Sequence, residues 1–209
     1  MATKLITPVA ILSYPWLAEP QAPQDEGGKA MYSAALIFDP AVMARYPQFG
    51  TSLRPLQEAA KEAMTDYFGD KLPGLLKSSA FKTGFRDDWE EKGYPSGSIY
   101  INARNERQPG AVYLFPNRLG KTDANGRLLP EQIAPADVEE ALYPGAYVRA
   151  SVRAFGFDKK GNKGVGWALN NLQLVNGSTP RLDSRRAAED DFDADASAVP
   201  MSLDDVTQQ

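Results

Sequence analysis

The sequence predicts a mainly β protein, built as a small β-barrel with one inserted α-helix and followed by an acidic tail. Three observations support this fold class. Short apolar stretches separated by turn residues recur along most of the chain, one segment alone has helical periodicity, and hydrophobic periodicity stops beyond Pro180. Many short strands with a single long helix favour a closed or partly closed barrel over a parallel α/β sheet.

The N-terminal third contains two expected strands and the helix. Residues 5–17, LITPVAILSYPWL, read as a first strand that Pro15 should break, and a loop rich in Pro, Gln and Gly follows. Residues 32–39, YSAALIFD, form the second apolar stretch. Residues 52–69 are expected to be helical, ending at Gly69. Their apolar positions recur three or four apart: Leu53, Leu56, Ala60, Met64 and Tyr67.

Residues 72–95 are polar and are expected to be mostly loop, after which short strands resume. The expected strands are SIYINAR (98–104), AVYLF (111–115), YVRASVRAF (147–155) and GWALNNLQLV (166–175). A short helical turn is expected over 136–142, and a hairpin loop over Asp158–Gly164.

The stretch YVRASVRAF has the alternation of a half-buried strand. Val148, Ala150, Val152 and Ala154 fall on one face, which is expected to point into the core. The other face carries Tyr147, Arg149, Ser151, Arg153 and Phe155. Cations and rings side by side match the phosphates and unstacked bases of a single-stranded nucleic acid, where stacking contributes roughly 1–3 kcal/mol per base.

Neighbouring segments repeat this combination of basic and aromatic residues. In SIYINARN the outward set is expected to be Tyr100, Asn102 and Arg104, and AVYLFPNR adds Tyr113, Phe115 and Arg118. The alternative is an ordinary barrel rim whose Arg stems cover apolar surface. The predicted DNA-binding residues are Tyr147, Arg149, Arg153, Phe155, Lys159, Lys160, Lys163, Trp167, Tyr100, Arg104, Tyr113, Arg118 and Trp89.

Composition and motifs argue against most catalytic chemistry. The chain has no Cys and no His, which excludes thiolate catalysis, disulfides and the commonest metal ligand. Two glycine-containing stretches fail as phosphate-binding loops: in 156–163 Asn162 stands where the lysine is required, and in 115–122 Phe115 replaces the first glycine. Asp87, Asp88, Glu90 and Glu91 supply enough carboxylates for a two-metal nuclease site, although such a run is usually a solvated loop. No cofactor is predicted.

The net charge of −4 is the average of two unlike regions. Residues 187–209 contain seven of the 27 acidic residues and no Lys or Arg, so residues 1–186 carry 20 acids against 23 basic residues. We expect residues 1–180 to form one folded domain and residues 181–209 a disordered acidic tail. Such a tail can compete weakly with DNA for a basic groove, and the alternative is a solubilising segment.

Two segments resemble a family of bacteriophage single-stranded DNA-binding proteins. The longer is PGAYVRASVRAFGFDKKGNKGVGWALNNLQLVNG (144–177), with its G-x-Y-V-x-A-S-V, G-N-K-G and L-N-N-L-Q patterns. The second is GFRDDWEEKGYPSGSIYINARN (84–105). The resemblance, which extends in fold to the corresponding protein of T7-like phages, implies an OB-fold core with an inserted helix, a groove of aromatic and basic residues, and an acidic C-terminal tail. Tails in that family often end in an aromatic residue, whereas this one ends VTQQ and has Phe192 as its one aromatic.

The resulting hypothesis is a non-catalytic protein that coats and protects single-stranded DNA, without sequence specificity, during phage DNA replication and recombination. Its expected partners are single-stranded DNA and, through the tail, replication or recombination proteins, and a homodimer is left open. No membrane contact is expected, and the expected location is the cytoplasm of the infected bacterial host. Two alternatives stay open: a metal-dependent DNA-processing enzyme using Asp87–Glu91, and a phage structural protein with an aromatic assembly face.

Overall fold

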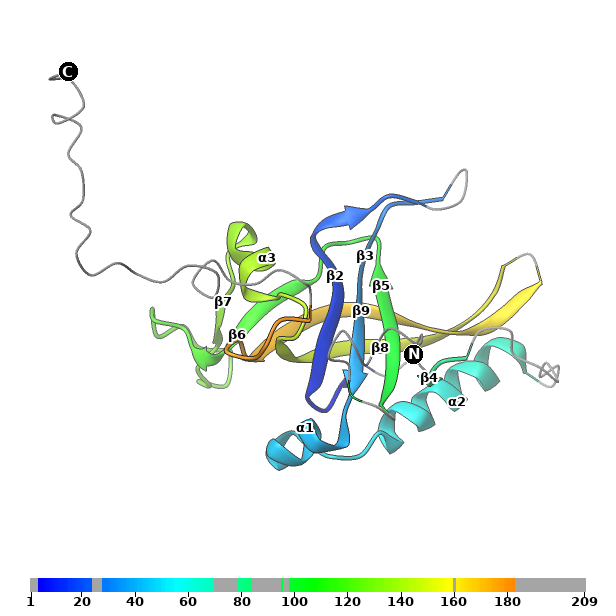
Figure 1. The fold of residues 1–209 in the computed structure, drawn as a ribbon, viewed down its shortest axis with the longest axis horizontal. Helices are drawn as coiled ribbons and strands as arrows, with labels where there is room; N and C mark the ends of the chain where they lie inside the picture. Colours follow the sequence, from blue (N-terminus) through cyan, green and yellow to red (C-terminus); the bar gives the residue numbers. More distant parts are fainter. Residues whose placement is uncertain are drawn as a thin grey trace, which may run out of the picture.

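A computed structural model describes residues 4–23, 28–69, 79–83, 95, 98–159 and 161–182, drawn in colour in Figure 1. The strands are β1 (Leu5–Ile6), β2 (Ala10–Gln21), β3 (Met31–Phe38), β4 (Lys82–Thr83), β5 (Ile99–Asn105), β6 (Gly110–Pro116), β7 (Pro130–Gln132), β8 (Tyr147–Lys159) and β9 (Asn162–Asn176). The helices are α1 (Pro40–Arg45), α2 (Arg54–Phe68) and α3 (Val138–Ala141), with 3₁₀ turns η1 (Pro47–Phe49) and η2 (Pro135–Asp137).

Five of these strands close a barrel. Their order around it is β2–β3–β5–β9–β8, and β8 pairs with β2 to complete the ring. Strand β5 runs parallel to β9, and the other pairs are antiparallel. Counted along the chain, the barrel strands follow the order 1-2-3-5-4-1, which is the arrangement of an OB-fold. The predicted mainly β, OB-fold-like barrel with an inserted helix is therefore confirmed.

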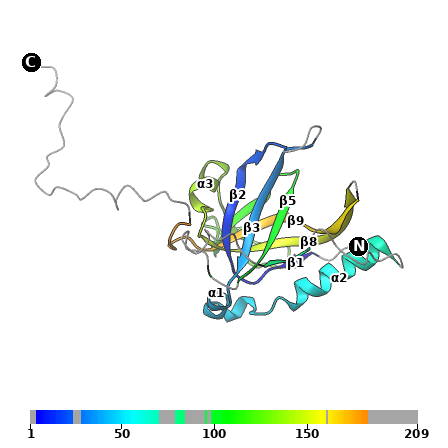
Figure 2. The same cartoon turned by 45° about the vertical axis from the view of Figure 1, so that its right-hand side comes forward.

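The remaining strands extend this barrel at its edges. Strand β1 pairs with β8, and β4 pairs with β5. Strand β6 continues along the edge of β9 beyond β5, and β7 pairs with β6, so residues 110–132 form a flap beside the barrel. Figure 2 shows this arrangement turned by 45°, with the β8–β9 hairpin rising above α2 in that view.

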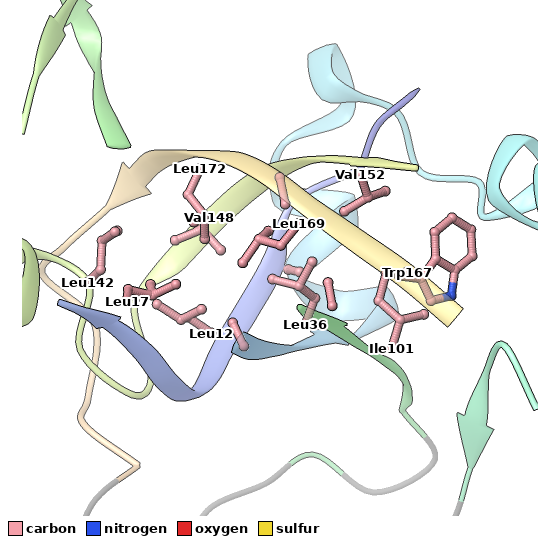
Figure 3. Packing of buried hydrophobic residues seen from close by; sticks show 14 of the residues in the cluster. Leu12, Leu17, Leu36, Ile101, Leu142, Val148, Val152, Trp167, Leu169 and Leu172 are labelled. Atoms are coloured by element: carbon pink, nitrogen blue, oxygen red, sulfur yellow. The ribbon is translucent and has the colours of Figure 1, made fainter. Parts of the chain in front are cut away.

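Alternate residues of the barrel strands form one hydrophobic core. The expected inward set of β8 is buried, with Val148, Ala150, Val152 and Ala154 each at most 3% exposed. The four other barrel strands, β2, β3, β5 and β9, also contribute side chains to this core, and Figure 3 shows how they pack. Burying each large apolar side chain stabilises the fold by roughly 1.5–3 kcal/mol. The labelled members are Leu12, Leu17, Leu36, Ile101, Leu142, Val148, Val152, Trp167, Leu169 and Leu172.

Helix α2 covers one side of the barrel, and its predicted extent is nearly right. It starts after Ser52, whose hydroxyl accepts a hydrogen bond from the Arg54 amide at 3.2 Å, and ends at Gly69, with φ of 55°. Leu56, Ala60 and Ala63 line its buried face. The small alanines allow close packing on β8, so close that a side chain at Gly156 would collide with Tyr67.

Three local expectations differ from the structure. Pro15 does not break the first strand: β2 continues through it, because Tyr14 adopts φ of 44° and the register with β3 shifts between Ser13 and Trp16. The expected hairpin loop 158–164 is largely strand, since β8 and β9 stay paired to Lys159 and Asn162. Helix α1 and strand β7 were not expected. Within the described part of the chain, no helix is long and apolar enough to cross a bilayer.

Candidate nucleic-acid interface

Two exposed arginines flank a small residue on the outer face of the barrel. Ala168 on β9 pairs with Arg153 on β8 and with Arg104 on β5, so the three residues lie in one row across three strands. Neighbouring strands are about 4.8 Å apart, which puts the two arginine backbones roughly 10 Å from each other. Both arginines are exposed, while Ala168 between them has no side chain beyond its methyl group.

Phe155 lies in the next row of the same face. It pairs across the hairpin with Gly166, and the Cζ end of its ring lies over the space that a side chain at Gly166 would need: a Cβ there would be 2.8 Å from Cζ of the ring. Phe157, two residues further along β8, pairs with Gly164, and its ring centroid is 6.2 Å from that of Phe155. The rings on β8 therefore lie beside residues of β9 that have almost no side chains on this face.

One lysine, Lys159, continues the face toward the hairpin tip. Lys159 is in phase with Phe155 and Phe157, whereas Lys163 pairs with Asp158 on the opposite face of the hairpin, with its Nζ 3.8 Å from a carboxylate oxygen of Asp158. The Lys163 and Asp158 side chains are exposed enough for solvent to screen this pair. The face thus combines Arg153, Phe155 and Lys159 along a single hairpin, with Lys163 on the reverse side.

The β3–β5 side of the barrel adds further polar and aromatic groups. Asn102 is exposed on the same face of β5 as Arg104. Tyr100, a predicted contact, is half-buried, with Lys82 Nζ 6.0 Å from its ring centroid. The row of Arg104 also continues through Ser33 on β3 to Trp16 on β2, whose side chain is 44% exposed.

Tyr147 and Arg149, which were predicted to contact DNA, are partly covered. They lie under the α1–η1 segment, where Tyr147 packs edge-on against Tyr46 at 6.2 Å between centroids. The Arg149 guanidinium lies 4.2 Å from the Phe49 ring centroid, and its Nε donates to the Thr7 carbonyl at 3.4 Å. Burial raises the pKa of Tyr147 and lowers the pKa of Arg149. The alternation was correct, but a second apolar cluster covers this end of the outer face.

The assignment of Trp167 to the interface is wrong. The side chain is 1% exposed and belongs to the core (Figure 3), where its ring packs edge-on against Phe81 at 5.8 Å. Its indole N–H donates to the Ala80 carbonyl at 2.8 Å. A base cannot stack on this ring unless the ring leaves the core, because its faces are buried and its N–H is already hydrogen-bonded.

Tyr113 and Arg118 lie apart from the row of Arg104 and Arg153. Tyr113 pairs with Leu174, a core residue of β9, and residues directly opposite in a parallel pair share a face, so Tyr113 points to the core side. Its ring stacks on Phe115, with centroids 4.8 Å apart and planes 15° from parallel. Tyr113 is level with Leu174, six residues or about 20 Å along β9 from Ala168, and Arg118 is exposed just beyond the end of β6.

The other predicted residues fall outside the described residues. These are Trp89 and Lys160, and the acidic run Asp87–Glu91 on which the enzyme alternative depends. The same holds for residues 183–209, which include the acidic tail.

Sequence reasoning missed four members of this face. Phe157 could have been found, because it continues the alternation of Phe155. Gly166 and Ala168 could also have been found, since Leu169 is in phase with Trp167 and leaves the small residues on the outer side. The exposure of Trp16 could not, because it follows the irregular backbone at Tyr14.

Comparison with known proteins places this fold. The sequence model of one family, described as "Enterobacter phage Enc34, ssDNA-binding protein", matches residues 3–201. The chain belongs to this family. No curated protein sequence gives a significant match.

Solved structures of the single-stranded DNA-binding protein of bacteriophage Enc34 have the same fold as this chain. The Enc34 protein in complex with ssDNA superposes with a TM-score of 0.60 at 18% identity, covering 85% of this chain and 88% of that chain. A second structure of the Enc34 protein gives a TM-score of 0.61 at 17% identity, covering 90% of this chain and 88% of that chain. The gp2.5 protein of bacteriophage T7 has a TM-score of 0.44 at 13% identity, covering 97% and 100%.

Proposed function

We propose that this protein binds single-stranded DNA, without sequence preference and without catalysing a reaction, on the outer face of β5, β9 and β8. The observation that carries the proposal is the row of Arg104, Ala168 and Arg153 beside Phe155. Guanidinium groups pair with phosphates, and a ring stacks on any base, so the face has contacts for both repeating parts of a single strand.

Membership of the Enc34 family supports this proposal independently. A relative with the same fold was solved in complex with ssDNA. In an OB-fold, oligonucleotides bind on the face of the second and third strands and on the first and last hairpin loops. Here those elements are β3, β5 and the β2–β3 and β8–β9 hairpins, which include the face proposed above.

The broader role that fits this activity is coating single strands during phage DNA replication and recombination, in the cytoplasm of the host. A protein that contacts only phosphates and base faces covers any sequence it meets. The acidic residues 187–209 would compete with DNA for the basic face and, once displaced, contact other proteins. The family match gives no support to the nuclease or structural alternatives.

The test is a gel-shift or fluorescence titration with single-stranded and duplex DNA of equal length over a salt series. We expect tighter binding to the single strand. We also expect a log–log salt slope of roughly −2 to −3.5, which corresponds to three to five neutralised phosphates at about −0.7 each. Equal affinity for duplex, or binding that does not depend on salt, would contradict the proposal. Magnesium-dependent loss of DNA would instead support the nuclease alternative.

A further inference from the structure

On the face of the sheet that carries the β8 rings, the residues of β9 have almost no side chains. Gly164 pairs with Phe157, Gly166 with Phe155, and Ala168 with Arg153. A strand interior usually avoids glycine, which lowers stability by roughly 0.5–1 kcal/mol relative to alanine. The face of β9 is therefore unusual, and backbone geometry does not explain it at Gly166, whose φ lies outside the left-handed range.

The contact with Phe155 does explain it. A Cβ built on Gly166 would lie 2.8, 3.1 and 3.3 Å from Cζ, Cε2 and Cε1 of the Phe155 ring. The three carbons at the far end of the ring thus lean across the hairpin onto the Gly166 backbone. Any side chain at position 166 would force the ring up and away from β9, since a carbon–carbon contact below 3.0 Å is not tolerated.

The orientation of this ring matters for a stacking contact. A base stacks on the flat face of a ring, and the gain depends on that face lying accessible and parallel to the base. Phe155 is half-exposed, with Arg153 two residues before it on the same strand face. Because the ring lies over Gly166, its opposite face is directed away from β9, next to the row of Arg104, Ala168 and Arg153.

We propose that Gly166 is a positioning residue for DNA binding: its missing side chain seats the Phe155 ring in the orientation that stacks on a base. This inference rests on the proposed function, because the base is the ligand that the oriented ring receives. Gly166 itself contacts the ring, and its effect on affinity acts through Phe155.

A double-mutant cycle with an oligo(dT) probe tests the proposal. Removing the ring in F155A should weaken binding roughly five- to a hundredfold, the range for one lost stacking contact. G166A should weaken binding by a similar factor. The double variant F155A/G166A should bind like F155A alone, because the Cβ at position 166 has no ring to displace. G166A combined with R104A should instead show the product of the two single losses.

Two results would overturn the inference. One is wild-type affinity in G166A, provided that the variant melts like the wild type. The other is a double variant that binds significantly more weakly than F155A, which would mean that the added Cβ at position 166 acts separately from the ring. This second comparison needs only F155A and the double variant, in which the added Cβ has room, so it stands even if G166A does not fold.

A measurement without DNA separates this inference from the proposed function. In the wild type, the ring current of Phe155 should shift the Gly166 α-protons upfield in an NMR spectrum, and F155A should abolish that shift. Absence of the shift would refute the contact between Gly166 and the Phe155 ring, whatever ligand the protein binds. A normal shift in a protein that does not bind single-stranded DNA would refute the proposed function and leave the contact intact.

Discussion

Arg149 and Arg153 lie on the same strand four residues apart, yet the structure gives them different roles. Arg153 is exposed in the row with Ala168 and Arg104. Arg149 is half-buried against the Phe49 ring and the Thr7 carbonyl. Replacing each by Ala in turn therefore compares a proposed phosphate contact with a structural contact, using the same chemical change on the same strand.

Arg153→Ala should weaken DNA binding without changing stability. Losing one phosphate contact lowers the log–log salt slope by about 0.7, which amounts to roughly an eightfold loss at 0.05 M salt and threefold at 0.2 M, relative to a 1 M reference. A surface substitution of this kind changes the free energy of unfolding by less than about 0.5 kcal/mol. The melting temperature should therefore stay within a degree or two of the wild type.

Arg149→Ala should have the opposite profile. A partly desolvated cation–π contact contributes about 0.5–2 kcal/mol. The hydrogen bonds of Arg149 to Thr7 and Gln173, both at 3.4 Å, are long and add little. A loss of about 1–2 kcal/mol should lower the melting temperature by roughly 2–8 °C in a domain of this size, with the salt slope unchanged.

The assays are thermal melts followed by circular dichroism and DNA titrations at four or more salt concentrations, well below the melting temperature. The reasoning is refuted if Arg153→Ala keeps the wild-type slope. It is equally refuted if Arg149→Ala lowers the slope as much as Arg153→Ala while melting like the wild type.

Three further outcomes are expected. Trp167→Phe removes the donor to the Ala80 carbonyl and should cost about 1–3 kcal/mol in urea unfolding, while DNA affinity of the folded protein stays the same; a large loss of affinity would return Trp167 to the interface. Val152→Asp places an unpaired charge at a fully buried site and should abolish folding, seen as loss of the native circular dichroism spectrum. Deleting residues 187–209 removes seven negative charges and should tighten single-stranded DNA binding most clearly at low ionic strength; unchanged affinity there would argue against competition by the tail.

The barrel was predictable because its strands follow simple alternation. The inward set of β8 and the apolar positions of α2 were placed correctly from period 2 and period 3.6 alone. Alternation assigns a residue to a face, however, and does not say what covers that face. Tyr147 and Arg149 are on the outer side as expected, but the α1–η1 segment, distant in the sequence, packs over them.

Errors at Trp167 and Pro15 have more local causes. Along β9, Trp167 and Leu169 are inward, and then Leu172 and Leu174, because the register with β8 shifts near Asn171. The side-chain phase therefore changes within one strand, so a single alternation along β9 does not assign Trp167 to the correct face. At Pro15, a single positive φ at Tyr14 lets the strand continue through a residue that normally ends it.

The position of β9 in the barrel has a consequence for how the protein is made. This strand is the last of the barrel to leave the ribosome, yet it fills the gap between β5 and β8 and also carries β6 on its edge. Until it emerges, the meander of β2, β3 and β5 has an open edge and an uncovered apolar side, including Leu36 and Ile101. Closure depends on contacts distant in the sequence, which form slowly. Nascent chains that end before Asn162 should therefore be protease-sensitive and need chaperone protection, and resistance should appear in one step once Asn176 is free.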